Sequence, residues 1–158
     1  MSIKYKLKQA LSQETCTNHP IAVVIENYGN YVLGYNGAPT RGISHEECSR
    51  KGFASGQGIE LCPTVHAEIK AISHAARQGI FLDKGIIYMS EWFPCDNCAK
   101  AIIEAGLEML VTPDEIYQDK TNHILIPKLQ NQPYNFEMAE RLIRQAGIEI
   151  IIDPSIKP

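Results

Sequence analysis

His66-Ala67-Glu68 and Pro94-Cys95-Asp96-Asn97-Cys98 are the two most informative segments of this chain, because together they hold an imidazole, two thiols and a carboxyl group. Imidazole and thiolate are good zinc ligands, and three protein ligands leave the fourth tetrahedral position open for a water molecule. Zinc at such a position acidifies the water toward hydroxide. We therefore predict that His66, Cys95 and Cys98 bind one catalytic Zn²⁺ and that Glu68 is a catalytic carboxylate that moves protons.

Neither segment is specific by itself. A C-x-x-C pair also occurs in redox sites and in structural zinc ribbons, and an H-x-E sequence on a helix is usually a solvated polar turn. The presence of both segments, in this order, is what favours a single metal site.

Both segments are predicted to lie at helix N-termini. Thr64 is expected to cap a helix whose apolar residues Ile69, Ile72 and Ala76 share one face. A second helix is expected to begin just after Pro94. The positive end of its dipole favours thiolate over thiol, so two helix N-termini would meet at one ion.

Length and composition predict one globular domain that spans residues 1–158, with 44% hydrophobic and 21% charged residues. No apolar run is long enough to span a membrane, and residues 1–11 lack the apolar core of a signal peptide, so we expect a cytoplasmic protein without a membrane partner. The net charge of −3 disfavours binding to nucleic acid and favours a small-molecule substrate. Five cysteines, two of them assigned to metal, argue against a disulfide framework.

Helices and strands are predicted to alternate along the chain. The predicted helices cover residues 2–15, begin near 64 and 95, and include 139–146, with Gly147 at the C′ position; the predicted strands cover residues 21–25, 31–35, 85–90, 107–111 and 148–152. Residues 27–30 are expected to form a hairpin turn, and residues 112–133 have no periodic pattern. This order predicts an α/β fold of three layers, with helices on both faces of a five-stranded mixed sheet.

A Gly-rich segment, residues 36–62, is too long to be a simple connection in so compact a chain. Its first residues, Asn36 and Gly37, offer an amide group and a backbone that a ligand can approach closely. Arg41 carries a forked guanidinium group suited to a phosphate. The alternative is that Asn36-Gly37 is an ordinary turn and Arg41 a solvated side chain, and the sequence favours neither.

Four motifs of this chain, taken in order, resemble the deoxycytidylate deaminase family over residues 31–111. They are Gly-Tyr-Asn-Gly-x-Pro (34–39), His-Ala-Glu (66–68), Pro-Cys-Asp-Asn-Cys-Ala-Lys (94–100) and Ile-Ile-Glu-Ala-Gly (102–106). The paired H-x-E and P-C-x-x-C motifs are the signature of zinc deaminases that act on nucleobases. The resemblance implies a cytidine-deaminase-like fold, zinc-dependent hydrolysis of dCMP to dUMP and ammonia, and a homo-oligomer, either a dimer or a hexamer.

The expected substrate-binding residues are Asn36, Gly37, Arg41, Ala67 and Trp92. Of these, Asn36 and its loop are the positions that the resemblance implies contact the nucleotide. Trp92 could stack on a base or pack in the core. The chain departs from the family at position 70, where it has lysine in place of the usual asparagine.

In the expected mechanism Glu68 transfers a proton to ring N3, hydroxide attacks C4, and Glu68 then transfers a proton to the exocyclic amine, which leaves as ammonia. One alternative is a deaminase of a free base or a purine, of the guanine or adenosine type, since it would share the metal site. Another is a non-catalytic, zinc-stabilised nucleotide-binding module. A second, structural zinc that uses Cys48, Cys62 and His45 is disfavoured because these residues lack the paired spacing of such sites. Cys16 is expected to be a buried thiol.

Overall fold

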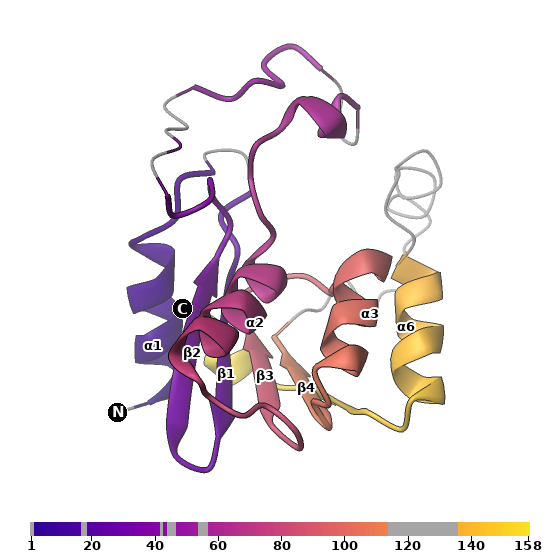
Figure 1. The fold of residues 1–158 in the computed structure, drawn as a ribbon. Coiled ribbons are helices and arrows are strands. Elements are labelled where there is room, and N and C mark those ends of the chain that lie inside the picture. Colours follow the sequence, from indigo (N-terminus) through magenta and orange to yellow (C-terminus); the bar gives the residue numbers. More distant parts are fainter. Residues whose placement is uncertain (1, 17–18, 42, 44–46, 54–56, 114–135) are drawn as a thin grey trace.

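The computed structural model describes residues 2–16, 19–41, 43, 47–53, 57–113 and 136–158. Its strands form one mixed sheet in the order β2-β1-β3-β4-β5 (Figure 1). The strands are β1 (Ala22–Asn27), β2 (Asn30–Tyr35), β3 (Ile86–Met89), β4 (Met109–Thr112) and β5 (Glu149–Ile152). β1 pairs antiparallel with both β2 and β3, whereas β3, β4 and β5 run parallel to one another. The predicted five-stranded mixed sheet is therefore confirmed.

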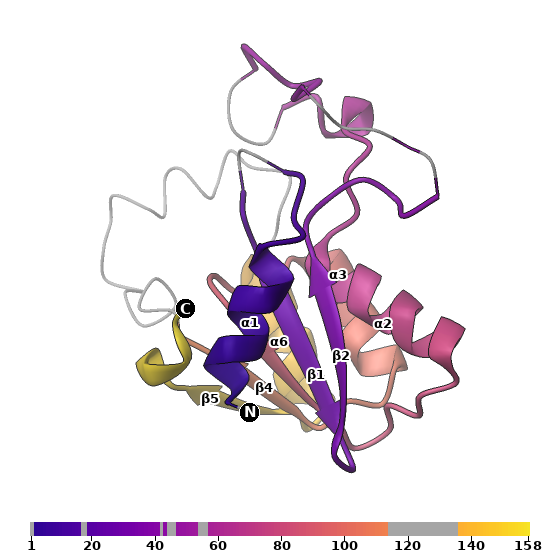
Figure 2. The same ribbon diagram turned by 90° about the vertical axis from the view of Figure 1, so that its left-hand side faces the viewer.

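Helices cover both faces of the sheet, as Figures 1 and 2 show. α1 (Ile3–Leu11) lies on one face, where Leu7 and Ala10 pack with Val24 of β1. α2 (Ala67–Gln78), α3 (Asp96–Glu104) and α6 (Phe136–Gln145) lie on the other face, over the larger core. Two short 3₁₀ helices complete the described elements, η1 (Ile59–Leu61) and η2 (Pro154–Ile156). The three-layer α/β/α prediction is confirmed.

The hairpin between β1 and β2 has a two-residue loop. Asn27 pairs with Asn30, and the intervening Tyr28 and Gly29 both have positive φ, at 47° and 79°. Positive φ at both central residues is the type I′ turn that matches the twist of paired strands. The hairpin predicted at residues 27–30 is confirmed.

The predicted end of α6 is also confirmed. Gly147 has a φ of 78°, its N–H donates to the carbonyl of Arg144, and the N–H of Ile148 donates to the carbonyl of Ile143. This pair of bonds is the Schellman motif, which uses glycine because the left-handed conformation carries a steric penalty for other residues.

Two predictions about helix boundaries are wrong. α1 begins after Ser2, whose hydroxyl accepts from the N–H of Tyr5, and ends at Leu11, four residues before the predicted end. The hydroxyl of Ser12 bonds instead to the carbonyl of Gln9, a local bond that competes with helix continuation. α2 begins at Ala67, with His66 and not Thr64 in the cap position.

The predicted irregular segment, residues 112–133, lies almost entirely outside the described residues. Within the described part of the chain, no helix has the length and apolar character needed to span a membrane.

Candidate active site

The N-terminus of α2 is capped by a residue from another part of the fold. Asn36 lies just after β2, and its Oδ1 accepts a hydrogen bond of 2.9 Å from the N–H of Ala67, 31 residues later. Its Nδ2 donates to the carbonyl of His19 at 2.8 Å. A free helical N–H is usually bonded by a local cap residue, and here Asn36 takes that place. His66 is therefore held at the start of α2 without using its own ring as a cap.

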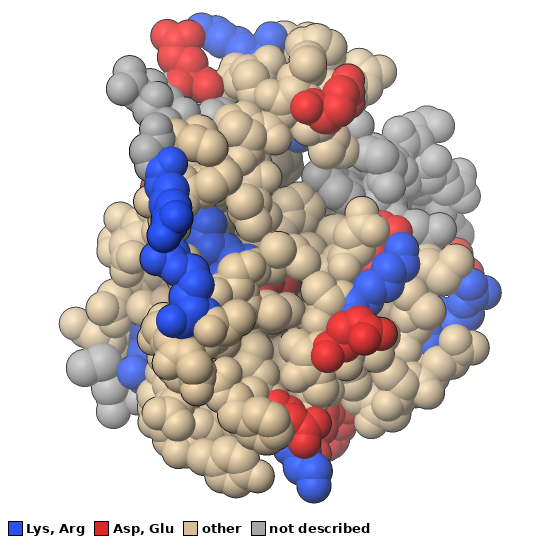
Figure 3. Space-filling view, viewed as in Figure 1, with Lys and Arg blue, Asp and Glu red and all other residues tan. Residues whose placement is uncertain are grey.

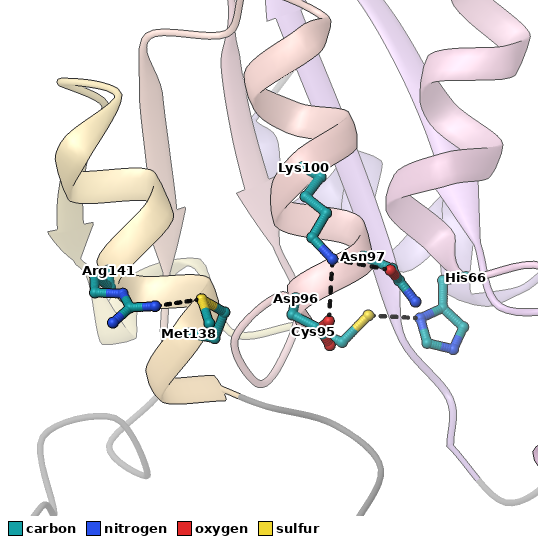
Figure 4. Close-up of polar contacts among 7 residues, drawn as sticks. All are labelled: His66, Cys95, Asp96, Asn97, Lys100, Met138 and Arg141. Atoms are coloured by element: carbon teal, nitrogen blue, oxygen red, sulfur yellow. Dashed lines mark hydrogen bonds and ion pairs between the residues drawn. The ribbon is translucent and has the colours of Figure 1, made fainter.

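α3 begins directly after the buried Pro94, with Cys95 in the cap position and Cys98 in the first turn. The first turn is also tied by Lys100, whose ammonium donates to Asp96 and Asn97 at 3.4 Å each (Figure 4). Figure 4 also shows the Cys95 sulfur pointing from this turn to the His66 ring. The prediction that α3 opens after Pro94 is confirmed, and it places both thiols beside the imidazole.

His66, Cys95 and Cys98 form a cluster whose ligand atoms all lie within 4.8 Å of one another. The Nδ1 atom of His66 is 3.5 Å from the sulfur of Cys95 and 3.4 Å from that of Cys98. Tetrahedral zinc with bonds of about 2.1 Å to nitrogen and about 2.3 Å to sulfur would hold these atoms about 3.6 Å apart. Both nitrogen–sulfur distances therefore match those expected around a zinc ion held by these three side chains.

The thiols differ in their affinity for protons. Hydrogen bonding from Cys98 and His66 lowers the pKa of Cys95 to about 4. The bond to Cys95 and burial raise the pKa of Cys98, because two adjacent buried thiolates would repel each other. A proton on one sulfur, or a cation between the two, removes the repulsion between them. A divalent metal that binds both sulfurs would displace that proton.

Glu68 lies in the first turn of α2 and is only 4% exposed. Burial raises the pKa of its carboxyl group, and the nearby charge of His66 opposes that shift. The hydrogen-bonding influence of Cys98 on this carboxyl also opposes the rise and places Glu68 beside the cluster. A carboxyl group in this environment exchanges protons more readily near neutral pH than an exposed one does.

The loop after β2 joins the same site. Gly37 forms an isolated antiparallel bridge with Val65, the residue before His66. A Cβ atom on Gly37 would lie 2.6 Å from the hydroxyl oxygen of Thr15, so a larger residue here would have to displace the Thr15 side chain. Of the predicted substrate-binding residues, Asn36, Gly37 and Ala67 are buried around the start of α2.

Trp92 lies three residues after the end of β3, half-buried, with a positive φ of 63°. Its carbonyl accepts from the hydroxyl of Thr112 at 2.7 Å. Its ring makes an edge contact with His19, with centroids 6.0 Å apart, and a tilted contact with Phe136 at 6.4 Å. Burial, with a contribution from the charge of Arg50, lowers the pKa of His19.

Arg41 is exposed and makes no hydrogen bond or ion pair with any residue that the structure describes. Figure 3 shows a recess between the upper loop segment and the helices below it, with charged atoms of both signs at its walls. The structure thus gathers the predicted site residues 36, 37, 66–68, 95 and 98 around the two helix N-termini, with Trp92 shortly before Cys95.

Within the described residues, His66, Cys95 and Cys98 are the single cluster of three side chains that could hold a metal ion. Cys16 is buried, as predicted. A second zinc that includes His45 cannot be placed, because residue 45 lies outside the described ranges.

Comparison with known families agrees with this geometry. The sequence model of the cytidine and deoxycytidylate deaminase zinc-binding region matches residues 1–113. The chain belongs to this deaminase family.

Relatives in the family are distant in sequence. The deoxycytidylate deaminase of Enterobacteria phage T2 is 24% identical over 92% of this chain and 88% of its own length. The human deoxycytidylate deaminase is 31% identical over 65% of this chain and 57% of its own length. The structure of a dCMP deaminase from cyanophage S-TIM5 in complex with dCMP and dUMP has a TM-score of 0.67 and 18% identity, covering 95% of this chain and 93% of that one. This likeness shows that the fold is shared.

Several contacts at the site could not be read from the sequence. The carbonyl of His19, the hydroxyl of Thr15 and the ammonium of Lys70 hold the loop at Asn36 from three sides. For Lys70 the sequence did give a sign of a special role, because lysine replaces the usual asparagine at that position. For Thr15 it gave no sign, because Thr15 falls in a segment predicted as helix.

Proposed function

We propose that the protein is a zinc-dependent hydrolase that converts dCMP to dUMP and ammonia. The observation that carries the proposal is the cluster of His66, Cys95 and Cys98 with the buried carboxyl of Glu68 beside it. Membership of a deaminase family and relatives named as deoxycytidylate deaminases support the reaction and the substrate.

His66, Cys95 and Cys98 would hold a single catalytic Zn²⁺. When bound, the ion supplies Lewis acidity that lowers the pKa of water. Glu68 would take one proton from the attacking water and deliver it to N3 of the pyrimidine, which makes C4 electrophilic, and the water oxygen would form a bond to C4. The same carboxyl would then take the second proton from that oxygen and pass it to the exocyclic amine, so that the C4–N bond breaks and ammonia leaves.

The proposed substrate contacts are Asn36, Gly37, Arg41, Ala67 and Trp92. The amide of Asn36 makes two structural hydrogen bonds, which leave it one N–H and one lone pair for a ligand. Trp92 offers a ring face or edge in the connection between β3 and α3. Arg41, exposed on the loop, offers a forked cation for the phosphate.

The decisive test measures ammonia release from dCMP, dCTP, cytidine, guanine and adenosine by the zinc-loaded protein. Turnover of dCMP is expected, and turnover of guanine or adenosine alone would instead identify a purine deaminase. Binding of nucleotides without turnover of any of them would identify a non-catalytic module.

Glu68→Gln tests the proton shuttle. The amide cannot exchange protons, so we expect a loss on the order of 100- to 10,000-fold in turnover with zinc content unchanged. Glu104→Gln is the matched control, since Glu104 is an exposed carboxyl at the end of α3, and it should keep the wild-type rate. Near-normal turnover by Glu68→Gln would show that another group moves the protons.

We also propose that residues 1–158 fold as one domain and that the protein is a homo-oligomer, either a dimer or a hexamer, in the cytoplasm. Limited proteolysis, light scattering and cell fractionation test these three statements separately.

A further inference from the structure

Lys70 is a buried cation on α2 and is only 4% exposed. Its ammonium donates to the carbonyl oxygens of Gly37 at 3.1 Å and Ala38 at 2.9 Å, and lies 4.2 Å from the centroid of the Tyr35 ring. Among the described residues it has no ion pair with a carboxylate. Two carbonyls and one aromatic face therefore take the place of a counter-ion, which is a costly arrangement for a cation unless each contact is well made.

The two carbonyls belong to the turn that follows Asn36. The carbonyl of Gly37 also accepts from the N–H of Val65 at 2.8 Å, and the N–H of Gly37 donates back to Val65 at 3.3 Å. On the opposite side, the N–H of Ala38 donates to the hydroxyl of Thr15 at 3.1 Å. Lys70 thus supplies a second link from α2 to this turn, in addition to the hydrogen bond from Ala67 to Asn36.

This link holds the two residues that follow Asn36, which is itself fixed by four hydrogen bonds. The carbonyl of Asn36 accepts from the N–H of Thr15 at 3.2 Å, and its N–H donates to the carbonyl of Ile21 at 2.9 Å. Its side chain spans from His19 to Ala67. Movement of the next two residues away from α2 would rotate the amide away from the start of that helix, where the nucleotide contact is proposed.

The contacts of Lys70 require a hydrogen-bond donor at position 70. Carbonyl oxygens accept hydrogen bonds but do not donate them, so a side chain at this position must supply N–H groups. An apolar side chain of the same length would fill the space but leave the carbonyl of Ala38 without this donor. Hydrogen bonds to a charged group are stronger than neutral ones, so the ammonium is a stronger tie than an amide would be.

From these contacts we propose that Lys70 is a positioning residue, which fixes the Asn36–Ala38 turn in the orientation that receives the nucleotide. Its effect on kinetics rests on the proposed dCMP deaminase function, whereas its effect on the turn does not.

The test compares Lys70→Met, Lys70→Gln and Lys70→Arg with Lys8→Met, a matched change of an exposed lysine on α1. Lys70→Met should raise the KM for dCMP about tenfold or more, the value of one charge-assisted hydrogen bond, with kcat changed less than about threefold. Zinc content should stay at the wild-type value. Lys70→Arg keeps the charge and the donors, so its KM for dCMP should be closer to that of wild type. The KM of Lys70→Gln should lie between those of Lys70→Arg and Lys70→Met. Lys8→Met should match wild type.

Amide hydrogen exchange gives a readout that needs no activity. In Lys70→Met, or in Lys70→Gln if the methionine variant does not fold, the N–H groups of Val65 and Ala38 should exchange faster than in wild type, while those of β3 should not change. An unchanged KM, a parallel loss of kcat and zinc, or unchanged exchange at these two amides would each overturn the proposal. Absence of dCMP turnover in the wild-type protein would instead overturn the proposed function, and the exchange result would still decide the role of Lys70.

Discussion

Gly34→Ala should displace α2, the helix that has His66 in its cap position, because α2 packs directly on this glycine of β2. A Cβ atom on Gly34 would collide with the carbonyl oxygen of Ala67 and lie 2.7 Å from both the N and the Cβ atoms of Ala71. Ordinary contact begins at 3.4 Å, so α2 would have to move by at least 0.7 Å. The opposing atoms are backbone atoms and a Cβ, which no rotamer change can move away.

The size of the effect follows from that shift. Overpacking of a core usually costs about 1–3 kcal/mol, which lowers the melting temperature by about 2–4 °C for each kcal/mol in a chain of this size. The movement also carries His66 and Glu68, while metal–ligand distances tolerate only about 0.2 Å. We therefore expect zinc affinity to fall about 10- to 100-fold, the range seen when support for a metal ligand is lost.

The matched control is Gly79→Ala at the other end of α2. Gly79 has a φ of 67°, and a Cβ atom added there would have no neighbour within 4 Å, so alanine meets backbone strain of about 1–2 kcal/mol without displacing the helix. Thermal unfolding measures the melting temperature of each variant, and competition with a chromophoric zinc chelator measures its zinc affinity. If Gly34→Ala loses stability but binds zinc as tightly as Gly79→Ala does, the packing of α2 on β2 does not set the geometry of the metal site.

Three further perturbations test the metal, the helix cap and a buried carboxyl group. Removal of zinc by a chelator should lower the melting temperature, and added zinc should restore it in proportion to its concentration, because the ion binds the folded state; a midpoint that does not respond to zinc would contradict a folded metal site. Asn36→Ala removes the acceptor for the N–H of Ala67 and should cost about 1–2 kcal/mol in urea unfolding, whereas Asn36→Asp keeps that acceptor and should lose less. Glu14 has a buried oxygen without a hydrogen-bond partner in the described structure, and burial raises the pKa of its carboxyl. The protonated Glu14 carboxyl therefore contributes fully to stability below the ordinary carboxyl pKa. This contribution is lost as the pH rises through the raised pKa of the folded state. Glu14→Gln should accordingly be more stable than wild type at neutral pH, by a small margin because solvent reaches most of this carboxyl group and screens its charge, with the difference vanishing in acid.

The sequence was sufficient for the regular parts of the fold. The type I′ hairpin at Tyr28-Gly29 and the Schellman motif at Gly147 depend on dihedral preferences of neighbouring residues, so local patterns predict them. The end of α1 was predicted too late because apolar periodicity does not show where residues 12–16 leave the helix to bond with the loop. The start of α2 was assigned to Thr64 because a local cap was expected where a distant one is used.

The chemistry of the site was determined by the sequence alone, since the identity and order of His66, Glu68, Cys95 and Cys98 specify which atoms can bind zinc and which can carry a proton. How those atoms are held was decided by the tertiary structure. Asn36 caps α2 from 31 residues away, and Lys70 binds carbonyls that lie more than 30 residues earlier in the chain. A hydrogen bond between segments so far apart depends on how the sheet and the helices pack, and no periodicity within either segment contains that information.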